Sequence, residues 1–298
     1  MTSAIRTENL SKRFRRTVAL DGLNLDVPEG SIYGLVGVNG AGKTTAIKVL
    51  MNILRPTGGR SEVLGTDSRH LRPRNFTEIG YVSENQEMPD WMTAGYFLKY
   101  ISALYPAWDR ALERELVAQF QLPLDRKLKD LSRGMRMKAA LASSLAYRPK
   151  LIVLDEPFTG LDPLVRDEVI EGLLARAEGT TVFISSHDLA EIESFASHIG
   201  YLDRHRLQFS EELERLSARF REIVLTFDHA PAMPKEWPSA WLQPESTGAV
   251  VRFVDALFDE DGVGAKVRAL FPDYRDMAVN GMPLRSIFVA LAKAGRAG

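Results

Sequence analysis

Cysteine is absent from this chain of 298 residues, which excludes disulfide bridges and thiol chemistry. Long apolar runs are also missing, since no stretch approaches the ~18 consecutive apolar residues of a membrane-spanning helix. The opening MTSAIRTENLSKRFRR lacks the apolar run of a secretory signal. Basic and acidic residues nearly balance, at 38 and 39, and no basic tract points to a nucleic-acid partner. We therefore expect a cytoplasmic protein without a membrane span of its own.

Apolar residues make up 45% of the chain, which is enough to form a substantial core. Three short runs, SIYGLVGV, LIVLDE and TTVFISS, have the composition of strands buried on both faces of a parallel sheet. Helical patterns follow at 43–54 and 163–178, so residues 1–218 predict an α/β domain. The turn-rich stretch at 56–67 indicates short antiparallel strands. Residues 88–148, approximately, indicate a helical insert.

Residues 219–298 predict a separate, accessory α+β domain. EIVLTF and AVVRFV have strand patterns, and PAMPKEWPSAWLQPEST between them carries four prolines. Two short helices are expected near 263–270 and 284–294. This part of the chain carries no recognisable chemical motif.

The stretch GVNGAGKTT, residues 37–45, fits the pattern G-x-x-x-x-G-K-[ST]. It lies between a strand pattern and a helix pattern, which is the context of a phosphate-binding loop. Backbone N–H groups would close around phosphates at a helix N-terminus, Lys43 would reach the β- and γ-phosphates, and Thr44 would ligate Mg²⁺. An ordinary glycine-rich turn is the alternative. The predicted nucleotide-binding residues here are Gly37, Asn39, Gly40, Ala41, Gly42, Lys43, Thr44 and Thr45.

An acidic pair ends the apolar run LIVLDEP at 151–157, at the carboxyl end of a strand, where α/β proteins place their ligands. Asp155 is suited to hold Mg²⁺, directly or through water, and Glu156 to polarise a water for attack on a γ-phosphate. Neighbouring strand residues point in opposite directions, so the two carboxylates can have different roles. Two acids alone are commonly a solvated strand end, but together with Lys43 they predict a nucleotide hydrolase.

Two further features follow the acidic pair. TGLD occupies 159–162, and His187 ends the next strand pattern, TTVFISSHD. A lone histidine at a strand end is commonly a surface residue. Its position one strand after the acidic pair favours membership of the same site.

Taken together, these motifs resemble the ATP-binding subunit of an ABC transporter over residues 1 to about 220. LSRGM, residues 131–135, stands where that family has LSGGQ. The resemblance implies that ATP is sandwiched between two subunits, and that Ser132 and Gly134 of one reach the γ-phosphate bound by the other. Arg133 and Met135 depart from the commonest form.

Arg133 leaves three interpretations open: a working variant, a decayed site or a plain helix cap. A cation close to a phosphate at a helix N-terminus is electrostatically favourable if its side chain can point away from the tight contact. We therefore expect a working variant.

The resemblance also suggests positions with weaker motifs. Phe14 in SKRFRR would stack on adenine, with a core phenylalanine as the alternative. In IGYVSENQE the family's glutamine position holds Glu84, and Gln86 follows two residues later. Either is a candidate metal or water contact, because carboxylate and amide oxygens suit Mg²⁺. The aromatic-rich segment 91–109 is expected to be partly insert core and partly a groove for a helix of a membrane subunit.

The implied activity is ATP hydrolysis, with ATP and Mg²⁺ as cofactors. Glu156 would orient or deprotonate the water, His187 would contact the γ-phosphate, and Asp162 would link the two sites of a homodimer or heterodimer. Transport requires a separate permease, which would hold this chain at the inner face of the cell membrane. The resemblance extends to bacterial ABC-2-type exporters, including antibiotic- and lantibiotic-related systems.

Two other classes compete with transport. One is a soluble ABC ATPase that acts without a permease on ribosomes or DNA. Such chains usually carry two ATPase domains or long coiled coils, and neither is found here. The other is a P-loop kinase or GTPase. The presence of LSRGM before the acidic strand argues against a kinase and against a GTPase. The N/T-K-x-D motif expected of a GTPase is also not found.

Overall fold

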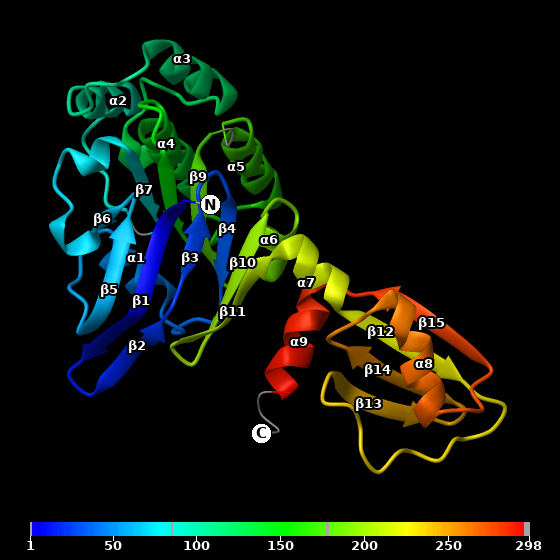
Figure 1. Cartoon of the computed structure of the whole chain (residues 1–298). Coiled ribbons are helices and arrows are strands. Elements are labelled where there is room, and N and C mark those ends of the chain that lie inside the picture. The colour runs from blue at the N-terminus through cyan, green and yellow to red at the C-terminus, as the bar shows by residue number, and fades with distance from the viewer. Residues whose placement is uncertain (1, 85, 177–178, 295–298) are drawn as a thin grey trace. The chain divides into compact units, whose positions relative to one another are not determined.

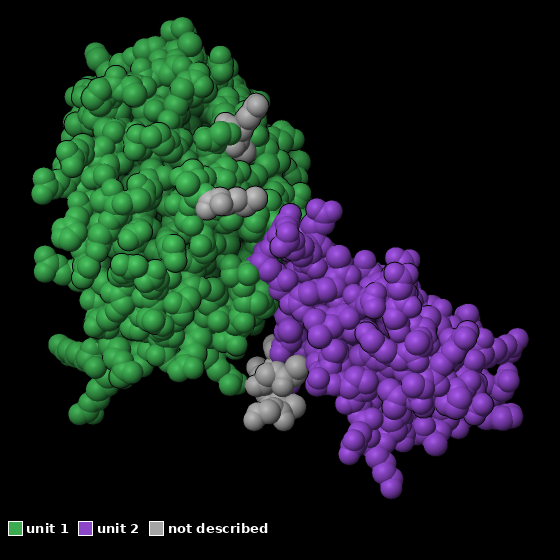
Figure 2. Space-filling model, in the orientation of Figure 1, with its two compact units in different colours: residues 1–210 green, residues 211–298 purple. Residues whose placement is uncertain are grey.

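The computed structural model describes residues 2–84, 86–176 and 179–294. The chain divides into two compact units, Met1–Ser210 and Glu211–Gly298, which Figure 2 colours separately. The division falls after Ser210 rather than after residue 218, because the short helix at 213–219 belongs with the second unit.

A six-stranded sheet forms the centre of the first unit, in the order β11-β10-β4-β9-β8-β7 (Figure 1). Its five strands from β10 to β7 are mutually parallel. Every residue of β8 and β9 is buried, as the unbroken apolar runs predict. The strands are β4 (Ile32–Val36), β7 (Ile79–Ser83), β8 (Leu151–Asp155), β9 (Thr181–Ser186), β10 (His198–Asp203) and β11 (Arg206–Glu212).

A smaller antiparallel sheet lies next to it, in the order β2-β1-β5-β6, with β3 paired to β1. The turn-rich stretch at 56–67 forms β5 and β6 of this sheet, as expected. Helix α1 (Lys43–Leu50) packs against strands of both sheets, and its apolar side chains join their common core. The strands are β1 (Ser3–Phe14), β2 (Thr17–Leu23), β3 (Asp26–Pro28), β5 (Gly58–Val63) and β6 (Thr66–Asp67).

The expected helical insert contains α2 (Ala94–Ser102), α3 (Arg110–Gln119) and α4 (Arg133–Leu145). Each begins at a capping side chain, Thr93, Asp109 and Ser132 respectively, which accepts a hydrogen bond from the first turn. Helix α4 is almost fully buried and packs against α2, α3, α5 (Pro163–Leu174) and β7. It therefore joins the insert to the nucleotide-binding part of the fold. Helix α6 (Leu189–Glu193) follows β9, and short 3₁₀ turns lie at 68–70, 75–77 and 128–130.

The second unit is an antiparallel sheet in the order β13-β14-β12-β15, with three helices among the residues described up to 294. The predicted strands and both predicted helices are present, but β13 and β15 were not anticipated. Strand β13 tolerates Pro244 because it lies at the sheet edge and is irregular between Leu242 and Glu245. The elements are α7 (Leu213–Arg219), β12 (Arg221–Thr226), β13 (Trp241–Thr247), β14 (Val250–Asp255), α8 (Glu260–Leu270), β15 (Asp276–Gly281) and α9 (Leu284–Ala294).

Candidate nucleotide-binding site

The glycine-rich loop connects β4 to α1 at the carboxyl edge of the parallel sheet. Gly42 caps α1 with a φ of 117°, a left-handed conformation that side chains rarely adopt. A Cβ atom there would also collide with the carbonyl oxygen of Ala19. Glycine at this position lets the loop close tightly, with the free N–H groups of α1 facing the site.

Lys43 lies under this loop, and its side chain is only 5% exposed. Its ammonium donates to the carbonyl oxygens of Gly37 at 2.5 Å and Val38 at 3.3 Å. It also lies 3.1 Å from Oε1 of Glu156. A buried ammonium needs such partners, and they hold this charge at the mouth of the loop, where a phosphate would bind.

Asp155 ends β8 and is buried, with Oδ1 accepting hydrogen bonds from Thr44 at 3.0 Å and Ser185 at 2.8 Å. Burial raises the pKa of Asp155 above its ordinary value, and the two hydroxyl donors oppose this only in part. The Thr44 hydroxyl and the Asp155 carboxylate thus meet at one point. Hard oxygen donors of this kind fit Mg²⁺.

Glu156 follows the strand and has a φ of 52°. Its backbone N–H donates to the Ser185 hydroxyl at 3.0 Å, the same hydroxyl that donates to Asp155. The two carboxylates therefore diverge because of a left-handed residue at the strand end, rather than through alternation along the strand. Strain at such a position is typical of functional sites.

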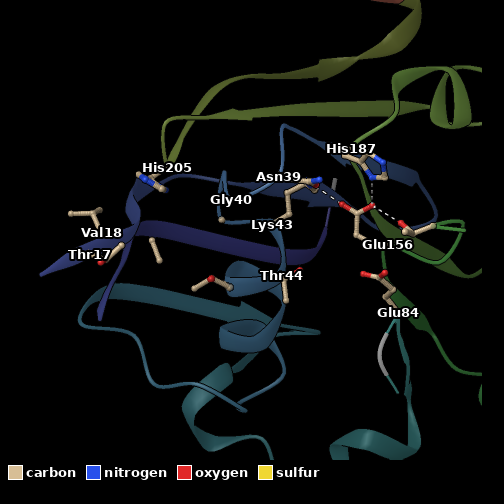
Figure 3. A pocket seen from close by; sticks show the side chains of 14 residues that line it. Thr17, Val18, Asn39, Gly40, Lys43, Thr44, Glu84, Glu156, His187 and His205 are labelled. Carbon is tan, nitrogen blue, oxygen red and sulfur yellow. Dashed lines mark hydrogen bonds and ion pairs between the residues drawn. The ribbon is translucent and has the colours of Figure 1, made fainter. Parts of the chain in front are cut away.

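The Glu156 carboxylate lies between two basic groups (Figure 3). Oε2 is 2.7 Å from Nδ1 of His187, and the Thr159 hydroxyl donates to the same oxygen at 3.3 Å. Burial would raise the pKa of Glu156, but the His187 hydrogen bond and the Lys43 charge outweigh it and lower the pKa. In return, the hydrogen bond to Glu156 raises the pKa of His187. Both pKa shifts favour an ionised Glu156 carboxylate beside a protonated His187 imidazole.

A cavity of about 450 Å³ surrounds these groups. Of the predicted site residues, Glu84, Glu156 and His187 line it, as do Asn39, Gly40, Gly42, Lys43, Thr44 and Thr45. Gly37 and Ala41 do not line it: Gly37 supplies the carbonyl that binds Lys43, and Ala41 packs into the core.

Phe14 is not among the residues that line this cavity. Its ring is 43% exposed, and the Lys12 ammonium lies 4.9 Å from the ring centroid. Thr17 and Val18, in the strand that follows, line the cavity instead, and so does His205 from the turn between β10 and β11. No motif marks these three residues, because their positions depend on how the two sheets pack.

The two glutamine-loop candidates have different surroundings. The Glu84 backbone N–H donates to the Asp155 carbonyl at 2.9 Å, and Glu84 lines the nucleotide cavity. Gln86 does not line the nucleotide cavity; it lines a neighbouring cavity of about 730 Å³ beside the helical insert, which Glu84 also lines. Within the described residues, no three His, Cys, Asp or Glu side chains form a metal cluster. A metal here would rely on the Thr44 hydroxyl, carboxylates, phosphates and water, as Mg²⁺ commonly does.

None of Ser132, Gly134 and Asp162 lines this cavity. Ser132 caps α4 by accepting from the N–H of Met135 at 3.2 Å, and Asp162 caps α5 by accepting from the N–H of Val165 at 3.1 Å. A Cβ on Gly134 would lie 2.7 Å from a methyl of Val165. Arg133 instead reaches Glu84, with Nη2 2.8 Å from Oε1.

A glycine-rich loop between β4 and α1, a buried lysine and an acidic pair at the end of β8, two strands along the sheet, together define a P-loop nucleotide hydrolase. The ABC transporter family model matches residues 20–159. The bacitracin transport ATP-binding protein BcrA of Enterococcus faecalis is 33% identical over 228 residues, covering 75% of this chain and 74% of that protein.

The daunorubicin/doxorubicin resistance ATP-binding protein DrrA of Streptomyces peucetius is 38% identical over 212 residues, covering 69% of this chain and 64% of that protein. The solved structure of an ATP binding subunit of an ABC transporter superposes with a TM-score of 0.66 at 24% identity, over 73% of this chain and 92% of that one. This chain belongs to the family of ABC transporter ATP-binding proteins, and the predicted fold and ATP hydrolase activity are confirmed. No helix within the described ranges is long and apolar enough to cross a membrane.

Proposed function

We propose that the chain binds ATP with Mg²⁺ in the 450 Å³ cavity and hydrolyses it inside a sandwich of two subunits, driving export through a separate permease. The observation that carries this proposal is the placement of Glu156 between Lys43 and His187, beside the Thr44–Asp155 pair. Thr44 and Asp155, together with Glu84, would hold Mg²⁺, which would neutralise charge on the transferring phosphoryl group.

We propose that the Glu156 carboxylate binds and orients the attacking water. Its lowered pKa keeps it ionised at neutral pH, so its oxygens are hydrogen-bond acceptors for a water. The water oxygen forms a bond to the γ-phosphorus, the bond from that phosphorus to the ADP oxygen breaks, and a water proton passes towards Glu156. Because a low pKa makes a weak base, orientation of the water is the larger part of its role.

Lys43 links ATP binding to the ability of Glu156 to accept a proton from the water. In the structure its charge stabilises the ionised form of Glu156. Phosphates bound in the loop would compete for the same ammonium. The pKa of Glu156 would then rise, because one of the two charges that lower it is shared with the nucleotide. Binding would thereby improve Glu156 as a proton acceptor.

A second subunit is proposed because Ser132 and Gly134 of the LSRGM segment do not line the cavity of their own chain. Ser132 and Gly134 lie at the N-terminus of α4, whose positive end favours an anion. Across a two-subunit sandwich, each would contact the γ-phosphate held by the partner, and Asp162 would lie at the same junction. His187, 40% exposed, is available to both the phosphate and that partner.

The permease would dock at the surface beside the helical insert. The 730 Å³ cavity there has a mixed lining, with Met88, Leu131 and Met137 among a larger number of polar and charged side chains. Nearby Trp91, Tyr96 and Tyr100 remain about half exposed or more, whereas Tyr105 and Trp108 pack against Tyr147. The aromatic segment is therefore divided between core and an apolar surface. Exposed aromatics of this kind suit a protein partner, and docking there would hold the chain at the inner face of the cell membrane.

Export of an antibiotic-like compound is the proposed task, supported by the names of the bacitracin and daunorubicin relatives.

The hydrolysis step is tested by measuring phosphate release by the purified chain and by Glu156→Gln, with Mg²⁺ and with EDTA. We expect Mg²⁺-dependent release, and a loss on the order of 10²–10⁴-fold in the variant with ATP binding retained. Wild-type turnover by Glu156→Gln would remove Glu156 from this role.

A further inference from the structure

Arg133 connects the LSRGM segment to the nucleotide cavity of its own chain. Its Nη2 lies 2.8 Å from Oε1 of Glu84, and the side chains are 49% and 29% exposed. Glu84 lines that cavity, whereas Arg133 belongs to the segment proposed to contact the nucleotide of a second subunit. One ion pair thus joins residues that would serve two different ATP molecules.

The guanidinium of Arg133 is also confined by the TGLD segment. A Cβ built on Gly160 would lie 3.1 to 3.5 Å from three guanidinium atoms, and Gly160 has a φ of 70°. The arginine therefore lies against the backbone of Gly160 on one side and bonds Glu84 on another. Thr159, the neighbour of Gly160, donates to Glu156. Arg133 therefore lies against a segment in which Thr159 is hydrogen-bonded to the catalytic carboxylate of Glu156.

Glu84 has two competing uses. Its backbone is fixed to Asp155 by the 2.9 Å hydrogen bond to the Asp155 carbonyl, so its side chain starts next to the proposed Mg²⁺ ligands. A carboxylate oxygen bonded to a guanidinium is less available to a metal ion or its water shell. Binding of Mg²⁺ with ATP and pairing with Arg133 therefore oppose each other.

We propose that Arg133 and Glu84 form a latch that couples the two ATP sites. Without nucleotide, Glu84 holds the guanidinium of its own chain. When ATP and Mg²⁺ bind, Glu84 turns to the metal or its water, and Arg133 is released to bind the γ-phosphate of the nucleotide held by the second subunit. This inference rests on the proposed sandwich dimer. It makes Arg133 a positioning residue before closure and a phosphate contact after it.

The first test measures the competition in single subunits. The affinity for a fluorescent ATP analogue is determined with excess Mg²⁺ and with EDTA, at protein concentrations too low for pairing. Arg133→Gln frees Glu84, so the gain in affinity on adding Mg²⁺ should increase about 1.5- to five-fold, the range of an exposed ion pair. In Glu84→Gln, the further change Arg133→Gln should have no effect on this gain, because the competing carboxylate is gone.

A matched control removes an ion pair of the same length elsewhere. Arg60 and Glu8 lie 2.8 Å apart on the antiparallel sheet, away from the nucleotide. Arg60→Gln should leave the Mg²⁺-dependent gain unchanged. An unchanged or smaller gain in Arg133→Gln would overturn the latch, and so would an equal gain in Arg60→Gln.

The second test measures pairing of subunits in a hydrolysis-deficient Glu156→Gln background with ATP and Mg²⁺. Arg133→Gln should weaken association on the order of tenfold, because a charged contact to phosphate is lost, and Arg133→Lys should restore part of it. The latch thus predicts opposite signs: stronger Mg²⁺ dependence and weaker association. A purely structural role would weaken both.

The two tests also separate this inference from the proposed function. Undiminished association in Arg133→Gln would overturn the release step. If no variant associates with itself, the proposed homodimer fails, while the Mg²⁺ measurement on single subunits still supports or overturns the competition at Glu84.

Discussion

The ammonium of Lys43 lies 3.1 Å from the carboxylate of Glu156, and both side chains are at least nine-tenths buried. The residue that would bind phosphate and the residue that would direct the attacking water are therefore ion-paired to each other. Each is held in place by the other until a nucleotide provides new partners for the lysine.

Lys43→Met should destabilise the fold by roughly 3 kcal/mol at neutral pH, since it leaves a buried carboxylate with His187 as its remaining charged partner. The pKa of Glu156 is lowered in the folded chain, so the stability it contributes is present at neutral pH and lost as pH falls through that lowered pKa. The destabilisation should therefore shrink in acid. Denaturant unfolding of both chains, from pH 7 down to the acid limit of folding, measures it. An equal loss at every pH would contradict the ion pair.

His187 should titrate at a lower pH when Glu156 is neutral. The hydrogen bond to Glu156 raises the pKa of His187 above its ordinary 6.5. That contribution to stability is fully present below 6.5 and disappears as pH rises through the raised pKa. Imidazole NMR signals followed with pH should show a higher His187 pKa in the wild-type chain than in Glu156→Gln. Identical titration curves would mean that the two side chains are not coupled in solution.

Gly134→Ala should cost about 1–3 kcal/mol, because its Cβ would lie 2.7 Å from a methyl of Val165 and would push α4 from α5. ATP-dependent pairing should weaken as well, since Gly134 lies at the proposed junction. Gly264→Ala is the control, because nothing lies within 4 Å of a Cβ there in α8. It should be neutral or stabilise the fold by up to about 1 kcal/mol. Thermal unfolding of both variants distinguishes a steric effect from a general one.

Ser185→Ala should weaken Mg²⁺-dependent nucleotide binding about tenfold. Its buried hydroxyl donates to Asp155 and accepts from the N–H of Glu156, so its loss leaves that N–H without this partner. It also removes one of the two hydroxyl donors that counteract the raised pKa of Asp155. The affinity for nucleotide with EDTA should change much less. Ser246→Ala, on the exposed edge strand β13, provides the control.

The sequence predicts the parts of this site that depend on local chain geometry. A glycine loop before a helix and two acids after a buried strand meet because parallel strands end at one edge. Thr17, Val18 and His205 could not be predicted, since they reach the cavity only through packing of two sheets. The Arg133–Glu84 pair joins positions 49 apart in the chain, and no spacing rule connects them.

The second unit shows a different limit. Its core strands β12 and β14 carry alternating apolar residues and were predicted, while β15 is almost wholly exposed and has no such pattern. Strand β13 lies in a proline-containing segment that lacks the signal of a regular strand. Edge strands need little burial on either face, so hydrophobic pattern alone does not reveal them.

The mass in solution of the Glu156→Gln chain, with and without ATP and Mg²⁺, tests most directly whether two copies close around the nucleotide. Blocked hydrolysis should trap two subunits around the nucleotide, so we expect a shift from monomer to dimer that requires both ATP and Mg²⁺. A chain that stays monomeric with ATP demonstrably bound would contradict closure of the LSRGM segment over a second copy.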